Sequence, residues 1–581
     1  MMSDETDTLL HFLERLQRRA EGLADSNPES PFADPLNFAI SLLRRSGNRP
    51  TITGLPPQLA VIGPTQSGKS SLVNLLLGQS AAEASPLAGF TQHPQGFSTT
   101  TLSSEQRTAI TVQFPDWRLA NNHPPGEADD YSLCRLDSGS GQQAAPLLIW
   151  DSPDFDSVSA RHYRHRIPTL CAMADAILLV VSREKYADQS VWRLLRLIAP
   201  VGLPLVICLN KTSNEEARIL TQTLAERLQQ ESITYLGIVA LPYLPEGEAT
   251  LADTPEAEAL RRTVTAAIEQ HTGTIPQARL AELLQHYWPA WSKPLQEEHS
   301  AAQQWATAID NGIAEALAIY QRDYLEHSNY EETFQRAIAE LLQLLEIPGL
   351  APVLSRARHY LSWPARQLGK LIQTDKGDGN ETGHEAQVLN DAVRHLLLSL
   401  QQQLGEQASQ SGTPSNLWWS QLGVALLQQQ TALSQQAADA IQAHQHAFEP
   451  EIRQAGEQLY QHLQHHPGKL HSLRATRATL DAAGIAFALK TGGIGISDLL
   501  FAPAMLAFTS SLAESAGGHY MHTIREQLKA RQRLAVESRI FDQALGKQLR
   551  QLAQQMPCEG LFQINAGELA QATDALKKLT S

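Results

Sequence analysis

Residues 61–78, "VIGPTQSGKSSLVNLLLG", decide the fold of this chain. An apolar run reaches Gly63, a short polar loop follows, and an apolar helical segment begins after Lys69. Gly63 and the triplet Gly68-Lys69-Ser70 fit the spacing G-x-x-x-x-G-K-[ST] in full. Between a strand and a helix, this spacing predicts a loop whose backbone N–H groups hold phosphates at a helix N-terminus.

The chemistry of the loop assigns roles to its residues. The Lys69 ammonium would reach the β- and γ-phosphates, and the Ser70 hydroxyl would bind Mg²⁺. We therefore expect Lys69 and Ser70 to act in catalysis. The predicted nucleotide-binding residues of the loop are Gly63, Pro64, Thr65, Gln66, Ser67, Gly68, Lys69, Ser70 and Ser71.

Two further strand ends carry polar residues. "PLLIWDSPDFDS", residues 146–157, delivers Asp151 to the end of an apolar strand, where a carboxylate can hold Mg²⁺ through water. "PLVICLNKTS", residues 204–213, delivers Asn210 and Lys211 in the same way. The Asn amide suits the edge of a purine ring, and the Lys stem can pack over the base. We therefore predict that Asn210 and Lys211 bind the base.

The order of these motifs, GPTQSGKS, DSPD and NKTS, resembles the translation-factor-related class of P-loop GTPases over roughly residues 57–272. The N-terminal helices and the long helical C-terminal half resemble bacterial dynamin-like GTPases. This resemblance implies GTP as substrate, Mg²⁺ as cofactor, and a homodimer across the nucleotide face that couples hydrolysis to movement of the helical region. The alternative is a soluble regulatory GTPase, or a slow nucleotide-binding scaffold, whose helical half binds a protein partner.

Three residues depart from the pattern of that family. Ser213 stands at the position of the Asp in N-K-x-D, the residue that pairs with guanine. The sequence therefore leaves both GTP and ATP as candidate substrates, and Glu215 or Glu216 is a candidate for the missing carboxylate. Asp154 stands where D-x-x-G has its Gly, and we expect it to point away from the γ-phosphate or to displace its segment. Phe155 follows, where a water-positioning Gln is common, and an apolar side chain cannot orient water. We therefore expect hydrolysis that is slow until a dimer partner completes the site.

A threonine in the loop after the first helix of such a domain closes on Mg²⁺ and the γ-phosphate. We prefer Thr91 for this role, with Thr99 or Thr100 as alternatives in the run "STTT". Thr91 thus joins the predicted catalytic residues, and the predicted metal ligands are Ser70, Thr91 and Asp151. The Gln-Ser pair of the phosphate loop lies one position later than in dynamins, so its dynamin role is not carried over.

The composition limits the partners. The net charge of −15 argues against nucleic acid, because phosphate binding needs a dense basic face. The four cysteines lie far apart, which favours a reducing, cytoplasmic compartment, and no signal peptide is visible.

At 581 residues the chain is too long for one core, and its pattern predicts three segments. Apolar runs alternate with helical segments over 51–275, which predicts an α/β P-loop domain with a mostly parallel sheet and helices on both faces. Residues 1–50 read as N-terminal helices that pack on the helical region, and 276–581 as an all-α bundle. The expected strands are 58–63, 108–114, 146–151, 175–182, 204–210 and 235–241, with a surface insertion over 115–145.

Residues 482–518 place two apolar segments on either side of a Gly-rich turn. The tract 499–513 is shorter than the roughly 20 residues of a spanning helix. This pattern fits a hairpin whose tip enters one leaflet, placing the protein at the inner membrane. It fits equally a buried helix pair within the bundle.

Three weaker candidates have simpler explanations. Residues 378–383 begin like a calcium loop, but Leu389 stands where the bidentate Glu belongs. His462, His465 and His466 lack an acidic or Cys partner in the sequence and suit an exposed helix end. The basic stretch 161–166 reads as an exposed helix face.

Overall fold

The computed structural model describes most of the chain, and its described residues form two compact units. The first unit comprises Met1–His299 with Cys558–Ser581, and the second comprises Ser300–Pro557. This division differs from the three predicted segments, because the end of the chain returns to the first unit. The described residues are 4–20, 32, 34–48, 55–83, 93–120, 130–135, 146–155, 166–243, 251–270, 275–327, 330–344, 384–409, 416–465, 518–556 and 561–580.

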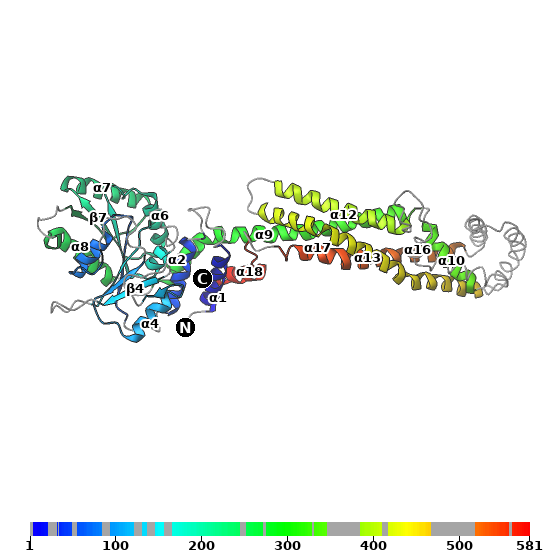
Figure 1. The fold of residues 1–581 in the computed structure, drawn as a ribbon, viewed down its shortest axis with the longest axis horizontal. Coiled ribbons are helices and arrows are strands. Elements are labelled where there is room, and N and C mark those ends of the chain that lie inside the picture. The colour runs from blue at the N-terminus through cyan, green and yellow to red at the C-terminus, as the bar shows by residue number, and fades with distance from the viewer. Residues whose placement is uncertain are drawn as a thin grey trace, which may run out of the picture. The chain divides into compact units, whose positions relative to one another are not determined.

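The first unit is built on an eight-stranded sheet in the order β3-β4-β2-β5-β1-β6-β7-β8 (Figure 1). β2 runs antiparallel to β5, and the other neighbouring pairs are parallel. The strands are β1 Gln58–Ile62, β2 Gln95–Ser98, β3 Arg118–Leu119, β4 Asp130–Arg135, β5 Leu148–Asp151, β6 Ala176–Ser182, β7 Leu205–Thr212 and β8 Gly237–Pro242.

Helices cover both faces of this sheet, as the sequence predicts. Because successive strand side chains point to opposite faces, Val61 and Ile62 enter different cores. On the face of the sheet that carries Ile62, the core includes side chains from α1, α2, α5, α6, α7, α18 and the start of α9. On the face that carries Val61, the core includes side chains from α3 and α8. The helices are α1 Asp4–Ala20, α2 Asp34–Asn48, α3 Lys69–Leu77, α4 Ser104–Gln113, α5 Arg166–Met173, α6 Gln189–Ile198, α7 Asn214–Gln230, α8 Pro255–Gln270, α9 Gln277–Tyr320 and α18 Ala566–Thr580.

The strand predicted at 108–114 is wrong, because this segment is the end of α4 and its C-cap. Ser103 and Gln106 form a capping box that starts the helix, and this box outweighs the β-branched residues of the run. Ile110 and Phe114, one helical turn apart, are buried in a core with Trp150 of β5. The predicted insertion over 115–145 is also wrong in part, since it contains β3 and β4.

The N-terminal helices are held within the first unit. Arg45 of α2 is buried and pairs with Asp175 at 2.7 Å, and it also donates to the carbonyls of Ala172 and Ala174. The other oxygen of Asp175 accepts the Gln58 backbone N–H at 2.8 Å. This buried pair therefore joins α2 to the amino ends of β1 and β6.

The second unit is all-helical over its described residues (Figure 1). α13 packs against α10, α12, α16 and the π-helical stretch Glu537–Gly546. The remainder of α9 also lies in this unit and is followed by the π-helical stretch Gln321–Leu325. The other helices are α10 Glu331–Leu344, α12 His384–Ser409, α13 Asn416–Gln464, α16 Gly518–Val536 and α17 Lys547–Leu552.

A polar cluster is buried between these helices. Glu385 of α12 accepts hydrogen bonds from Tyr320 at 2.8 Å and from Gln532 at 2.6 Å. The His444 ring lies 3.8 Å from the same carboxylate, which would be an ion pair only with a protonated ring. Burial, with a smaller effect of nearby Arg539, lowers the pKa of His444 to about 4, so the ring is neutral at pH 7.

No described helix is long and apolar enough to cross a membrane. The hairpin predicted over 482–518 lies outside the described residues, apart from Gly518 at the start of α16.

Candidate functional site

The carboxyl ends of three parallel strands bring the predicted site together. The pairing of Val61 with Asp151 aligns the ends of β1 and β5, and the pairing of Ser182 with Asn210 aligns those of β6 and β7. In an open α/β sheet, ligands bind at this edge. The phosphate loop, Asp151 and Asn210 therefore face one region, as the sequence predicts.

The phosphate loop has the backbone that its glycines allow. Gly68 has φ +91°, and Gln66 takes a positive φ of 61°, which stores strain at the site. The Lys69 ammonium donates to the carbonyls of Gly63 at 3.0 Å and Pro64 at 3.2 Å. Lys69 thus lies over the loop, its side chain buried, at the start of α3.

Ser70 and Asp151 form an oxygen-rich pair suited to Mg²⁺. The Ser70 hydroxyl donates to one carboxylate oxygen of Asp151 at 2.6 Å, and the other oxygen is buried without a hydrogen-bond partner. Burial raises the pKa of Asp151 to about 6, against the opposing effects of the Ser70 hydrogen bond and the Lys69 charge. A buried carboxylate with a free oxygen beside a hydroxyl is a fitting donor set for a hard cation.

The base-binding pair is tied to the phosphate loop. The Asn210 amide donates to the Ser67 carbonyl at 2.9 Å, and Lys211 donates to the Gln66 carbonyl at 3.1 Å. Lys211 takes a positive φ of 60°, and its N–H bonds the Asn210 side chain at 2.9 Å. These contacts hold the end of β7 against the loop.

Ser213 caps α7 instead of offering a carboxylate. Its hydroxyl donates to Glu216 at 2.8 Å, and Arg183 of the β6–α6 connection donates to the other oxygen of Glu216 at 2.7 Å. These hydrogen bonds, led by that from Arg183, lower the pKa of Glu216 to about 2. The structure thus brings Glu216 to Ser213. Arg183 is a residue that the sequence did not indicate, since only the fold brings β6 beside β7.

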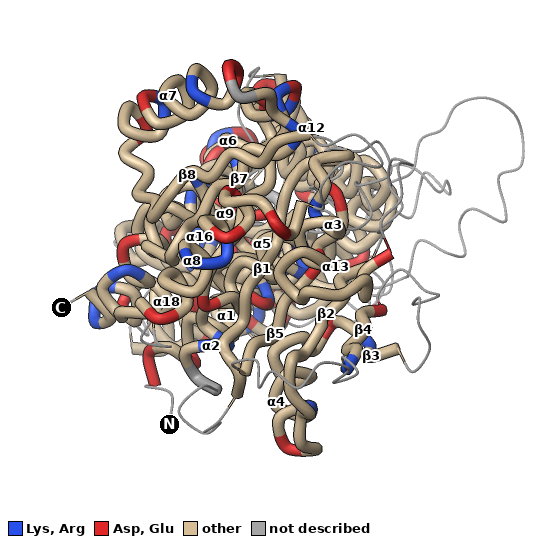
Figure 2. Tube along the Cα trace, turned by 90° about the vertical axis from the view of Figure 1, so that its left-hand side faces the viewer, with Lys and Arg blue, Asp and Glu red and all other residues tan. Residues whose placement is uncertain are grey.

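Charged residues of both signs occur along α7, namely Glu215, Glu216, Arg218, Glu226 and Arg227 (Figure 2).

Asp154 lies at the phosphate loop in this structure and does not point away from it, while the alternative of a displaced segment stays a prediction. Its carboxylate forms an ion pair with Lys69, and both side chains are buried. The attraction of a buried ammonium for the nearest carboxylate explains this position. Phe155 is buried in the core that contains α2 and α5, consistent with an apolar role.

The direction of β2 shows whether the candidate threonines Thr99 and Thr100 lie near the predicted nucleotide site. Because β2 is antiparallel to β5, Gln95 lies beside Asp151 while Ser98 lies beside Leu148, at the far end of the strand. Thr99 exchanges hydrogen bonds with Leu147, beyond that end. Thr99 and Thr100 are therefore carried away from the nucleotide edge. Thr91 lies outside the described residues and stays a prediction.

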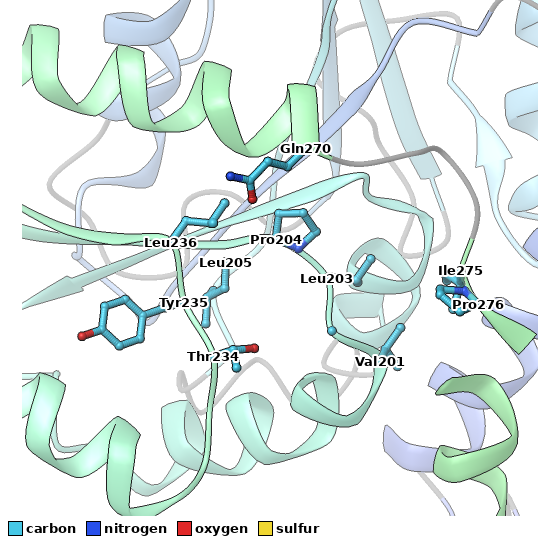
Figure 3. A pocket seen from close by; sticks show the side chains of 11 residues that line it. Val201, Leu203, Pro204, Leu205, Thr234, Tyr235, Leu236, Gln270, Ile275 and Pro276 are labelled. Atoms are coloured by element: carbon cyan, nitrogen blue, oxygen red, sulfur yellow. The ribbon is translucent and has the colours of Figure 1, made fainter. Parts of the chain in front are cut away.

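A cavity of about 310 Å³ lies at the opposite edge of the sheet (Figure 3). Its lining includes Leu205 at the start of β7, Leu236 just before β8 and Pro276 just before α9. The cavity is therefore separate from the phosphate loop, which follows the end of β1. Among the other candidates, Arg166 is buried over the Trp117 ring, while 378–383, His466 and 161–165 lie outside the described residues. The described residues hold no group of three metal-ligating side chains.

A phosphate loop, a buried carboxylate beside a hydroxyl, and an Asn-Lys pair tied to the loop, all at one edge of a mostly parallel sheet, are typical of a P-loop nucleotide-binding domain. Residues 58–211 match a family model described as 50S ribosome-binding GTPase. This part of the chain is a P-loop GTPase domain. A search of curated proteins found no match.

Solved structures are similar at low sequence identity. Era from Aquifex aeolicus bound to GDP and AlF4⁻ is 16% identical over 37% of this chain and 56% of that chain, with a TM-score of 0.24. Era with MgGDPNP and a 16S ribosomal RNA fragment is 15% identical over 40% of this chain and 66% of its own, with a TM-score of 0.25. A member of an oligomerised bacterial dynamin pair is 11% identical over 99% of this chain and 95% of its own, with a TM-score of 0.34. The chain therefore spans less than two thirds of the length of the Era chains.

Proposed function

We propose that the protein binds and hydrolyses GTP with Mg²⁺, and that the nucleotide state moves its helical half. The observation that carries this proposal is the pair of ties from Asn210 and Lys211 to the phosphate loop. These ties support the proposal because they hold the predicted base-binding pair against the predicted phosphate loop. The Lys69 ammonium would bind the phosphates, and Ser70, Asp151 and Thr91 would hold Mg²⁺, which would neutralise charge on the phosphate oxygens.

Turnover measurements test this function directly. GTP and ATP hydrolysis, each followed at several protein concentrations with and without Mg²⁺, report the base, the metal and the need for a dimer together. We expect GTP turnover that requires Mg²⁺ and rises per molecule with concentration. The Lys69→Ala variant should lose nucleotide binding. Wild-type turnover by that variant would contradict the assignment of the site.

The preference for guanine rests on Glu216 in this proposal. Guanine has a 2-amino donor that inosine lacks, and a carboxylate accepts such a donor. We expect Glu216→Gln to lower the preference for GTP over ITP by roughly three- to tenfold, the effect of one exposed charged hydrogen bond. Glu215→Gln, one residue away on the same helical turn, is the control. An equal effect of both substitutions would contradict this role.

The role of the helical half separates two candidate functions. In the first, residues 482–518 contact a membrane, with nucleotide-dependent homodimers at its inner surface, as in dynamin-like GTPases. In the second, the protein is a slow regulatory switch that binds a protein partner, which the buried Phe155 favours because it cannot orient water. Liposome flotation with and without a GTP analogue distinguishes them. Absence of lipid binding in both states would overturn the first function.

A further inference from the structure

All three protons of the Lys69 ammonium are already used. Two go to the carbonyls of Gly63 and Pro64, and the third faces the carboxylate of Asp154. The Lys69 side chain is only 5% exposed, so water does not compete for it. An ammonium offers three donors. An anion that takes a hydrogen bond from Lys69 must therefore replace one of these partners.

Asp154 is the partner that gives way. The loop carbonyls belong to the backbone of a loop that is closed by the Ser67 N–H, which donates to the Pro64 carbonyl at 3.3 Å, and that is tied to β7 by Asn210 and Lys211. Asp154 carries a negative charge, and a phosphate arriving at Lys69 repels it across a site with little water to screen the two charges. The ion pair thus opposes the binding of phosphates and does not oppose the binding of the base or the sugar.

We propose that Asp154 determines which nucleotides the site holds, by competing with the phosphates for Lys69. This inference rests on the proposed nucleotide site. A nucleoside diphosphate or triphosphate reaches Lys69 and has to break a buried ion pair. A monophosphate does not reach it and meets no such obstacle. Asp154 therefore weakens the binding of GDP and GTP, and so speeds their release, without affecting GMP.

The displacement of Asp154 has a structural route into the core. Ser152 is fixed to β1 by its N–H, which donates to the Val61 carbonyl at 3.2 Å. Phe155, on the other side of Asp154, is 5% exposed and shares its core with α2 and α5. It also lines a small pocket with Asp34 at the start of α2 and Ile167 of α5. A change at Lys69 is thus transmitted to the N-terminal helices through one peptide segment.

The first test measures affinity in the full-length protein. We expect Asp154→Asn to bind GDP and a non-hydrolysable GTP analogue about tenfold more tightly than wild type, because the amide carries no charge to hold Lys69. GMP binding should be unchanged. Asp116→Asn is the matched control, since Asp116 forms an exposed ion pair with Arg44 in the same unit. Asp154→Gly provides a second variant and should behave like Asp154→Asn.

Equal gains for GMP and GDP, or no gain for GDP, would overturn the proposal. If wild type bound no guanine nucleotide at all, the proposed function would fail instead, and hydrogen exchange without nucleotide would still test the ion pair. We expect the amides of residues 154 and 155 and of α2 to exchange faster in Asp154→Asn than in wild type. Identical exchange in both proteins would show that the ion pair does not hold this segment.

Discussion

At the scale of single residues, the site depends on glycines where no side chain fits. A Cβ on Gly68 would lie 2.3 Å from the Asn210 amide nitrogen, and one on Gly63 would lie 2.2 Å from the Val180 carbonyl oxygen. Gly68 also has a left-handed backbone, which costs an ordinary residue about 1–2 kcal/mol. The closeness of the loop to β7 and β6 therefore excludes any side chain at these positions.

We expect Gly68→Ala to abolish nucleotide binding, because its methyl group would displace Asn210 from the Ser67 carbonyl. Gly78, at the other end of α3, is the matched control. It has a similar φ of +69°, but nothing lies within 4 Å of its Cβ position. Gly78→Ala should lose about 1–2 kcal/mol of stability in urea unfolding, and Gly68→Ala should lose more because its methyl group also meets Asn210. Only Gly68→Ala should fail in calorimetric titration with GDP, and equal binding by the two variants would contradict this account.

At the residue scale, the sequence predicted the site residues that belong to local motifs but not the contacts between them. Lys69, Ser70, Asp151, Asn210 and Lys211 were predicted because their spacing and strand-end positions are local patterns. The sequence flagged Asp154 and Ser213 as departures but gave no partners for them. Their partners are set by tertiary contacts that no local pattern encodes.

At the scale of elements, the apolar runs predicted five strands correctly and failed at one segment of similar length. β1, β5, β6 and β7 were predicted because their apolar runs are buried on both faces of the sheet. β8 was predicted from its apolar run, although most of its residues are only partly buried. The seven residues 108–114 are ambiguous between strand and helix, and the capping box at Ser103 decided for the helix. The strand β4, "DYSLCR", was missed because its polar residues break the apolar run.

The buried pair between α2 and β6 predicts a large effect of one arginine. We expect Arg45→Ala to cost about 3–5 kcal/mol of unfolding free energy, because it leaves Asp175 charged and buried without its partner. The neighbouring Arg44, whose partners Glu14 and Asp116 are partly exposed, is the control and should cost at most about 1 kcal/mol. Denaturant unfolding measures both. A small loss for Arg45→Ala would show that α2 is not held by this pair.

The buried His444 of α13 predicts a pH effect on stability. Its pKa is about 4 in the folded state and about 6.5 when unfolded, so the unfolded chain binds the extra proton first. Stability is therefore full above pH 6.5 and falls between pH 6.5 and 4, by roughly 3 kcal/mol in total. The His444→Leu variant lacks the titrating ring. The difference in unfolding free energy between this variant and wild type should therefore change between pH 6.5 and pH 4. A constant difference from pH 7 to pH 4 would contradict the neutral buried ring.

At the scale of the whole molecule, the chain leaves the first unit and returns to it at one place. Glu298 accepts the backbone N–H groups of Phe562 at 2.8 Å and Gln563 at 3.0 Å, and the His299 ring contacts the Ile564 carbonyl at 2.6 Å. α18, which follows, packs against α1. The second unit is thus inserted in sequence between two paired segments of the first.

This arrangement predicts that the second unit can be removed. A protein in which residues 300–557 are replaced by a short Gly/Ser linker should fold, because the core shared by α1, α9 and α18 is complete without them. We expect it to unfold cooperatively and to bind GDP with the affinity of the full chain. Deletion of residues 558–581 as well is the control and should destabilise it, since α18 contributes Leu569, Leu576 and Leu579 to that core. A molten or aggregated product of the first deletion would contradict the division.

The return of α18 also sets the order of events during synthesis. The ribosome makes α1 first, but α1 meets α18 only after the intervening second unit has been made. Domains generally fold as units while the chain emerges, and the N-terminal one usually completes first. Here the order is reversed, because the helices of Ser300–Pro557 can pack while α1 still lacks its partner. A nascent chain of this protein therefore lacks the α18 contacts of α1 until residues 561–580 emerge, and among the described residues only α2 and the start of α9 cover α1 before then.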